Sequence, residues 1–283
     1  MIGHTPYYIN VDGRLMDVNE PQVMGILNVT PDSFYEDSRW QSETQIVKRA
    51  EQIVAEGASI IDIGAYSSRP GASEVSEKEE MERLAMALKA VRQAVPNAVI
   101  SIDTFRAAVA QMCVEEYGTH IINDISGGDL DKEMFATIAR LKVPYVLTHM
   151  RGTPQIMQEQ TAYADVTKEV MVHIGQRIDS LHEAGVCDII LDPGFGFAKT
   201  LEQNYQLMAH LQEFKALGVP ILVGVSRKSM IYNLLGCSAA EALNGSTVLH
   251  TTALLKGANI LRVHDVKAAV EAVKITRKIM DYQ

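Results

Sequence analysis

Polar residues stand at the ends of several short apolar runs along the chain. Asp103, Asn123 and Asp192 end three of these runs. Two carboxylates and an amide offer a mixed edge of hydrogen-bond donors and acceptors, which suits a flat, nitrogen-rich heterocycle better than a metal ion. These three residues are therefore predicted to bind such a heterocycle.

Basic residues gather near the last two apolar runs. Lys228 follows one run, and Arg262 and His264 end the other, while Arg69 follows an earlier run and could reach the same place. Because the whole chain carries a net charge of −9, this local clustering predicts a site for an anionic group such as a phosphate. The alternative is that these cations pair with nearby acids as salt bridges.

Asn28 ends the first apolar run. A neutral amide cannot bind a cation tightly alone, but it could complete an oxygen shell around Mg²⁺ together with phosphate oxygens and water.

Other polar residues at the ends of runs have equally good structural interpretations. Asp62 could order loop backbone or contact a ligand, and Asp124 and Asp265 could cap helices, as Asp often does. His149 ends the fifth run and is expected on the same rim as the other residues. Three further histidines are expected on solvated helix faces or between helices: His173, His182 and His210.

The elements that must position these residues alternate regularly. Eight short apolar runs occur at 23–27, 59–63, 98–102, 120–122, 144–148, 188–191, 221–225 and 260–263. Stretches with helical apolar spacing lie between them, for example 46–56, 77–95, 105–117 and 166–184. Eight strand–helix units predict a (β/α)₈ barrel, in which the carboxyl ends of the strands meet at one rim. A doubly wound open sheet is the alternative, but the Gly-rich phosphate motif common in such sheets is absent after the first run.

The chain before the first of these runs predicts a β-hairpin, with strands at 7–11 and 14–16 joined by an Asp12-Gly13 turn. Its expected role is to cover the bottom of the barrel. The loops at 30–42 and 65–76 are long and are candidates for mobile lids. Phe34 in the first of them could close over a substrate ring or pack the loop.

Length and composition limit the classes of protein. The 283 residues are close to the roughly 250 of one barrel, so one domain spanning 1–283 is predicted. The acidic balance speaks against nucleic acid as a partner. There are only three cysteines and neither a signal peptide nor an apolar run long enough for a membrane span is found, so a cytoplasmic protein is predicted.

The sequence resembles the dihydropteroate synthases of folate biosynthesis, which belong to the pterin-binding family. The matching stretches are GILNVTPDSF (25–34), SIDT (101–104), NDISGG (123–128), HMRGTP (149–154), LDPGFGF (191–197), SRKS (226–229) and RVHD (262–265). They extend from the first strand to the last, and their joint specificity is high although each one alone would be weak.

The resemblance implies a transferase that joins 4-aminobenzoate to 6-hydroxymethyl-7,8-dihydropterin diphosphate and releases pyrophosphate. It also implies a homodimer that uses Mg²⁺, held on the diphosphate by Asn28. Further roles follow by position. The pterin would be bound by Asp103, Asn123, Asp192 and Lys228, with Met150 as an apolar floor. The diphosphate would be bound by Arg69, Arg262 and His264. The aminobenzoate would be bound by Ser68, Phe34, Pro70 and Ser226.

Two departures from the family pattern affect these roles. The loop that commonly reads GGESTRPG is GAYSSRPG here, so Tyr66 replaces Glu and Ser68 replaces Thr. In the first loop, the acid that usually follows Phe-Ser is displaced, and Asp32, Glu36 or Asp37 could take its part.

Three other functions are compatible with parts of this pattern. A folate-dependent methyltransferase of the pterin-binding family would share the fold and the acids, but it would not need the basic residues, and no corrinoid-binding DxHxxG segment is present. A Schiff-base aldolase could use Lys228 if its pKa were depressed. A pterin-binding barrel without catalysis would be expected to lack Asn28 or Arg262, and both are present.

Overall fold

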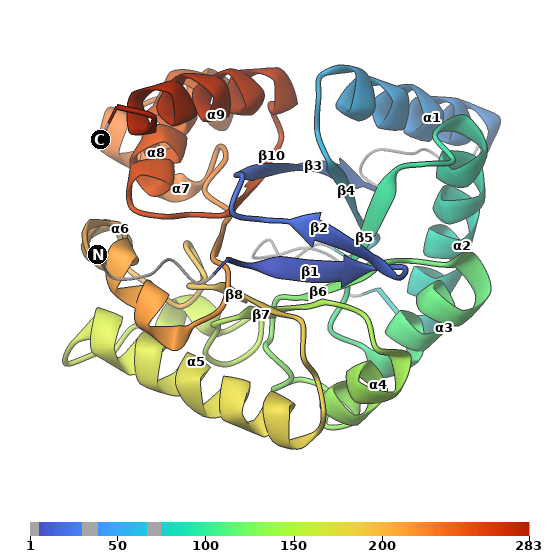
Figure 1. Cartoon of the computed structure of the whole chain (residues 1–283), viewed down its shortest axis with the longest axis horizontal. Coiled ribbons are helices and arrows are strands. Elements are labelled where there is room, and N and C mark those ends of the chain that lie inside the picture. The colour runs from blue at the N-terminus through green and yellow to red at the C-terminus, as the bar shows by residue number, and fades with distance from the viewer. Residues whose placement is uncertain (1–5, 30–38, 67–74, 283) are drawn as a thin grey trace.

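Eight parallel strands form the centre of the protein in the computed structural model, which describes residues 6–29, 39–66 and 75–282 (Figure 1). The strands are β3 (Gln22–Asn28), β4 (Ile60–Gly64), β5 (Val99–Asp103), β6 (Ile121–Asp124), β7 (Tyr145–Thr148), β8 (Ile189–Asp192), β9 (Leu222–Val223) and β10 (Ile260–Val263). They pair in the order β8-β7-β6-β5-β4-β3-β10-β9, and a parallel bridge between Leu191 and Ile221 closes the ring. The predicted (β/α)₈ barrel is confirmed.

The strands lie where the apolar runs predict them, with most ends shifted by only one or two residues. All five residues of β4 are buried, as expected for strands covered on both faces. The clearest difference is β9, which pairs over Leu222–Val223 only, although the apolar run extends over 221–225.

Helices surround the barrel and follow the strands in turn (Figure 1). They are α1 (Arg39–Ala55), α2 (Glu77–Ala94), α3 (Ala107–Tyr117), α4 (Met134–Leu141), α5 (Val166–Glu183), α6 (Leu201–Ala209), α7 (Ser229–Leu235), α8 (Leu243–Leu255) and α9 (Val266–Met280). In the described part of the chain, three 3₁₀ segments accompany them: Met157–Glu159, Leu211–Leu217 and Ala239–Glu241. Within the described part of the chain, no helix combines the length and apolar character that a membrane span requires.

The predicted hairpin is present as β1 (Tyr8–Val11) and β2 (Arg14–Asp17). Asp12 and Gly13 both have positive φ, at 49° and 77°, as a type I′ hairpin turn requires. The hairpin lies across the centre of the ring in Figure 1. Its buried Ile9 and Val11 form a cluster with side chains from inside the barrel, among them Met24, Ile60, Ile121, Val146, Ile190, Leu222 and Ile260. The predicted cover over the bottom of the barrel is therefore confirmed.

We expect this cover to matter for stability. Ile9 is 1% exposed, so Ile9→Ala removes buried methyl groups and should lower the free energy of unfolding by about 2–5 kcal/mol in urea denaturation. Leu15→Ala in the same hairpin is the matched control, because Leu15 is 74% exposed and its loss should change stability by less than about 0.5 kcal/mol. Equal effects of the two substitutions would contradict a packed hairpin.

Candidate active site

Four side chains from four strands form a hydrogen-bonded network at the carboxyl end of the barrel. Arg262 on β10 donates from Nε to Oδ2 of Asp62 at 2.6 Å and from Nη2 to Oδ2 of Asp103, also at 2.6 Å. Asn123 donates to the same oxygen of Asp62 at 3.1 Å. One cation thus holds two carboxylates side by side, and an amide completes the group.

Strand register brings these side chains together. Asp103 on β5 pairs with Asn123 on β6 and, on its other side, with Gly64 on β4. Asp62 stands two residues before Gly64 and is fully buried, so it lies one layer deeper in the barrel than Asp103. A Cβ at Gly64 would lie 3.3 Å from the Cβ of Asp103, so a glycine there leaves room for the carboxylate.

Two residues of the network, Asp103 and Arg262, have shifted pKa values. Burial raises the pKa of Asp103 to about 7; the charge of Arg262 opposes this rise, while the charge of Asp62 adds to it. Burial would lower the pKa of Arg262, but the charges of Asp62 and Asp103 outweigh it and raise that pKa. Arg262 therefore stays cationic, and Asp103 can gain or lose a proton near neutral pH.

Asp192 on β8 and Lys228 stand beside this network. Burial raises the pKa of Asp192, and the charges of Lys228 and Arg262 counteract the rise. Burial also lowers the pKa of Lys228 to about 8, against the charge of Asp192. A Cβ at Gly224 would lie 3.8 Å from both Oδ2 of Asp192 and Cβ of Arg262, which places Asp192 next to the network across this glycine.

Apolar side chains border the acids. Met150 is 2% exposed and packs in a small cluster with Met157 and Ala198, and Phe197 lies against it. The ammonium of Lys228 lies 4.5 Å from the centre of the Phe197 ring. An apolar surface next to a polar edge is the arrangement that a flat heterocycle needs.

The remaining described site residues lie around the mouth of the barrel. Asn28 is exposed at the carboxyl end of β3. Ser226 accepts a hydrogen bond from the backbone N–H of His264 at 3.1 Å, so the segments after β9 and β10 are tied together. Several other residues that the sequence analysis singles out lie outside the described residues: Phe34, Ser68, Arg69, Pro70, Asp32, Glu36 and Asp37.

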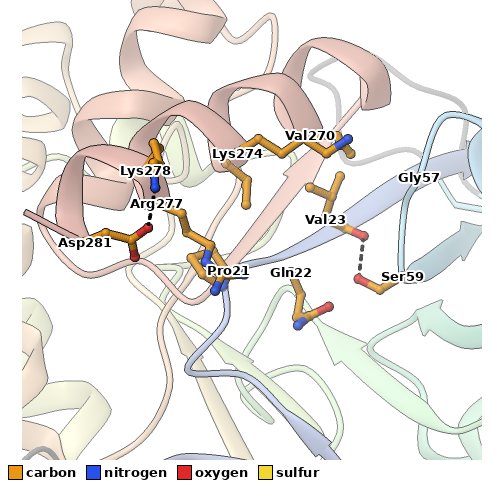
Figure 2. Close-up of a pocket in the computed structure, with 11 residues that line it drawn as sticks. Pro21, Gln22, Val23, Gly57, Ser59, Val270, Lys274, Arg277, Lys278 and Asp281 are labelled. Carbon is orange, nitrogen blue, oxygen red and sulfur yellow. Dashed lines mark hydrogen bonds and ion pairs between the residues drawn. The ribbon is translucent and has the colours of Figure 1, made fainter.

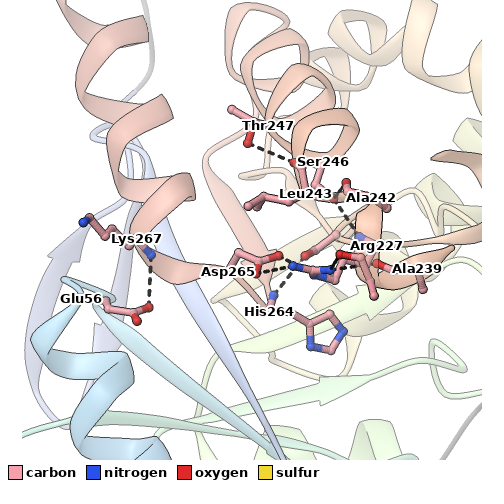
Figure 3. Close-up of polar contacts among 12 residues, drawn as sticks. Glu56, Arg227, Ala239, Ala242, Leu243, Ser246, Thr247, His264, Asp265 and Lys267 are labelled. Carbon is pink, nitrogen blue, oxygen red and sulfur yellow. Dashed lines mark hydrogen bonds and ion pairs between the residues drawn. The ribbon is translucent and has the colours of Figure 1, made fainter. Parts of the chain in front are cut away.

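Asp124 and Asp265 have structural roles. Asp124 is buried and accepts hydrogen bonds from Ser126, from the Gly128 N–H and, at 2.7 Å, from the Tyr145 hydroxyl. Asp265 precedes α9 but makes no side-chain cap; it binds Arg227 through two hydrogen bonds of 2.8 and 2.9 Å (Figure 3). The imidazole of His264 lies apart from this ion pair in the same view.

Two of the histidines that the sequence analysis names are more buried than their positions in the sequence suggest. His149, directly after β7, is 1% exposed, and its Nδ1 lies 3.0 Å from Nζ of Lys199. His173 on α5 is half-buried, because its ring packs edge-on against His149 with centroids 5.0 Å apart. His182 and His210 are exposed, as predicted.

Lys199 is the residue that sequence reasoning missed. Lysines just before a helix are usually solvated, yet this one is only 4% exposed. The available signal was its place after the Gly-rich segment that follows Asp192, where a buried loop needs donors for its carbonyl groups.

A cavity of about 430 Å³ lies at the opposite end of the barrel, between α9 and the amino ends of β3 and β4 (Figure 2). Its charged side chains are already engaged in part, since Arg277 pairs with Glu20 and Lys278 with Asp281. In barrel enzymes the chemistry lies at the carboxyl ends of the strands, so the rim is the candidate active site and this cavity is not.

The fold and the rim together define a class of protein: a (β/α)₈ barrel with buried acids and a cation gathered at the carboxyl ends of its strands. The chain belongs to the pterin-binding enzyme family, whose sequence model matches residues 24–264, and within it to the dihydropteroate synthases, which are transferases. It is 43% identical to dihydropteroate synthase of Escherichia coli (strain K12) over 265 residues, which cover 93% of each chain. It is 44% identical to the enzyme of a Synechocystis strain over 256 residues, 89% of this chain and 88% of that one.

Solved structures agree with these sequence matches. Dihydropteroate synthase of Xanthomonas albilineans, solved with 4-aminobenzoic acid, superposes with a TM-score of 0.89 at 35% identity, covering 98% of this chain and 99% of that one. The Yersinia pestis enzyme in a sulfonamide drug complex also gives 0.89, at 38% identity, covering 97% of this chain and 100% of that one.

Proposed function

We propose that this protein condenses 4-aminobenzoate with 6-hydroxymethyl-7,8-dihydropterin diphosphate, giving 7,8-dihydropteroate and pyrophosphate. The observation that carries the proposal is the Arg262 network with Asp62, Asp103 and Asn123 at the barrel rim. It supplies carboxylate and amide groups for a pterin, beside cations for a diphosphate. The close sequence relatives support the same reaction.

The pterin is proposed to lie against the acids in the mouth of the barrel. Its ring N–H and amino groups would donate to Asp103 and Asp192, and Asn123 would bond a ring heteroatom. Lys228 would lie close to the same edge, and Met150 would form the apolar floor. The raised pKa values of Asp103 and Asp192 fit carboxylates buried for a ligand that donates hydrogen bonds.

The diphosphate is proposed to leave toward the cations. As the C–O bond breaks, negative charge grows on the leaving group and positive charge on the pterin methylene. Arg262 uses Nε and Nη2 for the acids, and its Nη1 bonds none of the described residues, so it can face the leaving oxygens together with His264 and Arg69. Asp103 or Asp192 would stabilise the cationic pterin in this dissociative displacement.

The arylamine attacks last and needs no strong base, because a neutral aniline nitrogen is already nucleophilic. Its pocket is proposed to comprise Ser68, Phe34, Pro70 and Ser226. Of these, the structure describes Ser226, which is buried at the rim where it ties the segments after β9 and β10 together.

Mg²⁺ is the proposed metal, and when bound it would neutralise charge on the leaving diphosphate. Mg²⁺ usually takes one or two protein ligands and completes its shell with phosphate oxygens and water. The exposed amide of Asn28 at the end of β3 fits that donor set. Chelation with EDTA should therefore abolish turnover and added Mg²⁺ should restore it, while Asn28→Ala should need a higher Mg²⁺ concentration for half-maximal rate. Full activity after chelation would contradict the metal assignment.

Pyrophosphate release tests the proposed reaction. The purified protein is mixed with the pterin diphosphate, with and without 4-aminobenzoate, and pyrophosphate is measured with a coupled assay. Release over many turnovers that requires both substrates is expected. The alternative is a methyltransferase of the same family, which would release no pyrophosphate under either condition.

The pH dependence of kcat/KM should report two of the buried groups. The pKa of Asp103 is raised to about 7, so below that pH it becomes protonated and loses the charge that the pterin needs. The pKa of Lys228 is lowered to about 8, so above that pH it loses its cation. We expect activity to fall on the acid side near pH 7 and on the basic side near pH 8.

Asp62→Asn provides the control for the acid limb of this profile. The charge of Asp62 helps to raise the pKa of Asp103, so its removal should move the acid limb to lower pH. An acid limb that stays in place would exclude Asp103 as its origin.

Three further properties are proposed. Residues 1–283 form one domain. The protein is cytoplasmic, in keeping with three free cysteines. It is a homodimer, supported by apolar side chains left exposed on α7, α8 and α9, namely Leu234, Leu235, Val248, Ile275 and Ile279, each at least 49% exposed. Sedimentation velocity at micromolar concentration should give the mass of two chains.

A further inference from the structure

Lys199 lies in the loop that connects β8 to α6, near the end of that loop, and its ammonium is enclosed by protein. Its Nζ donates to the carbonyl oxygen of Gly194 at 2.9 Å and to that of Phe197 at 3.0 Å. The third contact joins Nζ to Nδ1 of His149 at 3.0 Å. An ammonium has three hydrogens to donate, so these three acceptors satisfy it completely.

His149 is adapted to be the third acceptor. Burial lowers the pKa of His149, and the charge of Lys199 lowers it further, so the ring is neutral. While Lys199 is protonated its nitrogen has no lone pair, so Nδ1 of the neutral ring accepts and Nε2 carries the hydrogen. Burial also lowers the pKa of Lys199, to about 7, against the charge of Asp192.

The loop that Lys199 holds is the one that places two of the pterin-site residues. The Gly194 N–H donates to Oδ1 of Asp192 at 2.8 Å. The carbonyl oxygen of Phe195 accepts from Nζ of Lys228 at 2.5 Å. The Gly194 carbonyl bound by Lys199 therefore belongs to the residue that bonds Asp192 and precedes the residue that bonds Lys228, and the Phe197 carbonyl lies two residues after the latter.

The backbone of this loop has an unusual conformation. Gly194 and Gly196 have positive φ, at 74° and 81°. A Cβ at Gly194 would lie 1.9 Å from the carbonyl oxygen of His149, so the loop packs directly on the backbone after β7. The cross-link from Lys199 to His149 joins these two segments at the point where they touch.

We propose that Lys199 is a positioning residue, whose ammonium, anchored on His149, fixes the 194–197 loop so that Asp192 and Lys228 face the pterin. This inference rests on the proposed function. A buried cation is costly, and an apolar side chain of similar length would fill the same space without that cost. The hydrogen bonds to the loop, and not the packing, are therefore its contribution.

Lys199→Met tests the proposal because it keeps the length of the side chain and removes its three hydrogen bonds. We expect the KM for the pterin diphosphate and the calorimetric Kd for 6-hydroxymethyl-7,8-dihydropterin to rise about 10- to 100-fold. The KM for 4-aminobenzoate should stay within twofold of the wild-type value. Lys256→Met is the matched control, since Lys256 bonds the Ala209 carbonyl on the surface, and it should change none of these values.

A pair of variants at His149 keeps the test decisive if Lys199→Met fails to fold. The side-chain oxygen of His149→Asn can accept in the place of Nδ1, whereas His149→Leu has no acceptor. The leucine variant should lose pterin affinity and the asparagine variant should recover most of it. A merely structural role would instead lower both thermal midpoints and leave the pterin Kd of the folded protein unchanged.

Two outcomes would overturn the inference: wild-type pterin affinity in a folded Lys199→Met protein, or equal losses in both His149 variants. Failure of the proposed function is distinguishable from either, because it would show as wild-type protein that releases no pyrophosphate.

Discussion

Arg262→Met should reduce kcat/KM for the pterin diphosphate by about 10²–10³-fold, the usual effect of removing a group that stabilises transition-state charge. The substitution removes the cation that faces the leaving group. It also leaves Asp62, which is fully buried, without its counterion, and an unpaired buried charge costs about 3–5 kcal/mol of stability. Both effects are measurable, by steady-state kinetics and by urea denaturation.

A double variant separates these two effects. Asp62→Asn combined with Arg262→Met removes the stranded charge, so it should regain most of the lost stability and none of the lost activity. Arg277→Met is the matched control, because Arg277 forms an exposed ion pair with Glu20 near the amino end of the barrel. Recovery of activity together with stability would mean that Arg262 acts only by holding the fold.

Asp192→Asn should lower kcat/KM for the pterin diphosphate about 10- to 100-fold, the range that corresponds to one hydrogen bond to a charged group. The side-chain oxygen of Asn can still accept from the Gly194 N–H, so the loop should keep its shape while the charge is lost. Lys228 also loses the neighbour that opposes the fall of its pKa, so the basic limb of the pH profile should move to lower pH.

The control for this variant is Asp281→Asn. Asp281 pairs with Lys278 at the end of α9, near the amino end of the barrel, and its substitution should leave the kinetics unchanged. Stability should hardly change in Asp192→Asn, because burial already disfavours the charge of this carboxylate. The assignment of Asp192 to the pterin would be contradicted if Asp192→Asn left the kinetics unchanged. It would also be contradicted if kcat/KM fell as much for 4-aminobenzoate as for the pterin diphosphate.

The barrel itself could be predicted from the sequence because its strands are buried on both faces and appear as continuous apolar runs. The hairpin could also be predicted from the sequence, since an Asp-Gly pair between two short strands favours a tight hairpin turn. The short β9 could not be predicted, because the apolar character of 221–225 does not reveal where pairing stops.

Part of the candidate site was visible in the sequence for the same reason. In a parallel barrel the strand ends meet, so Asp103, Asn123 and Arg262 had to come near one another. The sequence does not show which partner each side chain contacts. Arg262 bonds Asp62 and Asp103, and His149 bonds Lys199, and these partners lie far away in the sequence. Lys199 was missed because two of its three acceptors are backbone carbonyls, which cannot be recognised from residue types.

The division of the rim into a pterin part and a diphosphate part is tested most directly by calorimetry with two ligands and two variants. The ligands are 6-hydroxymethyl-7,8-dihydropterin and its diphosphate ester, and the variants are Asp192→Asn and His264→Ala. We expect Asp192→Asn to lower the affinity for both ligands by the same factor, and His264→Ala to lower only the affinity for the diphosphate ester. The proposed division is wrong if His264→Ala lowers the affinity for the free pterin as much as the affinity for its ester. It is also wrong if Asp192→Asn leaves the affinity for the free pterin unchanged.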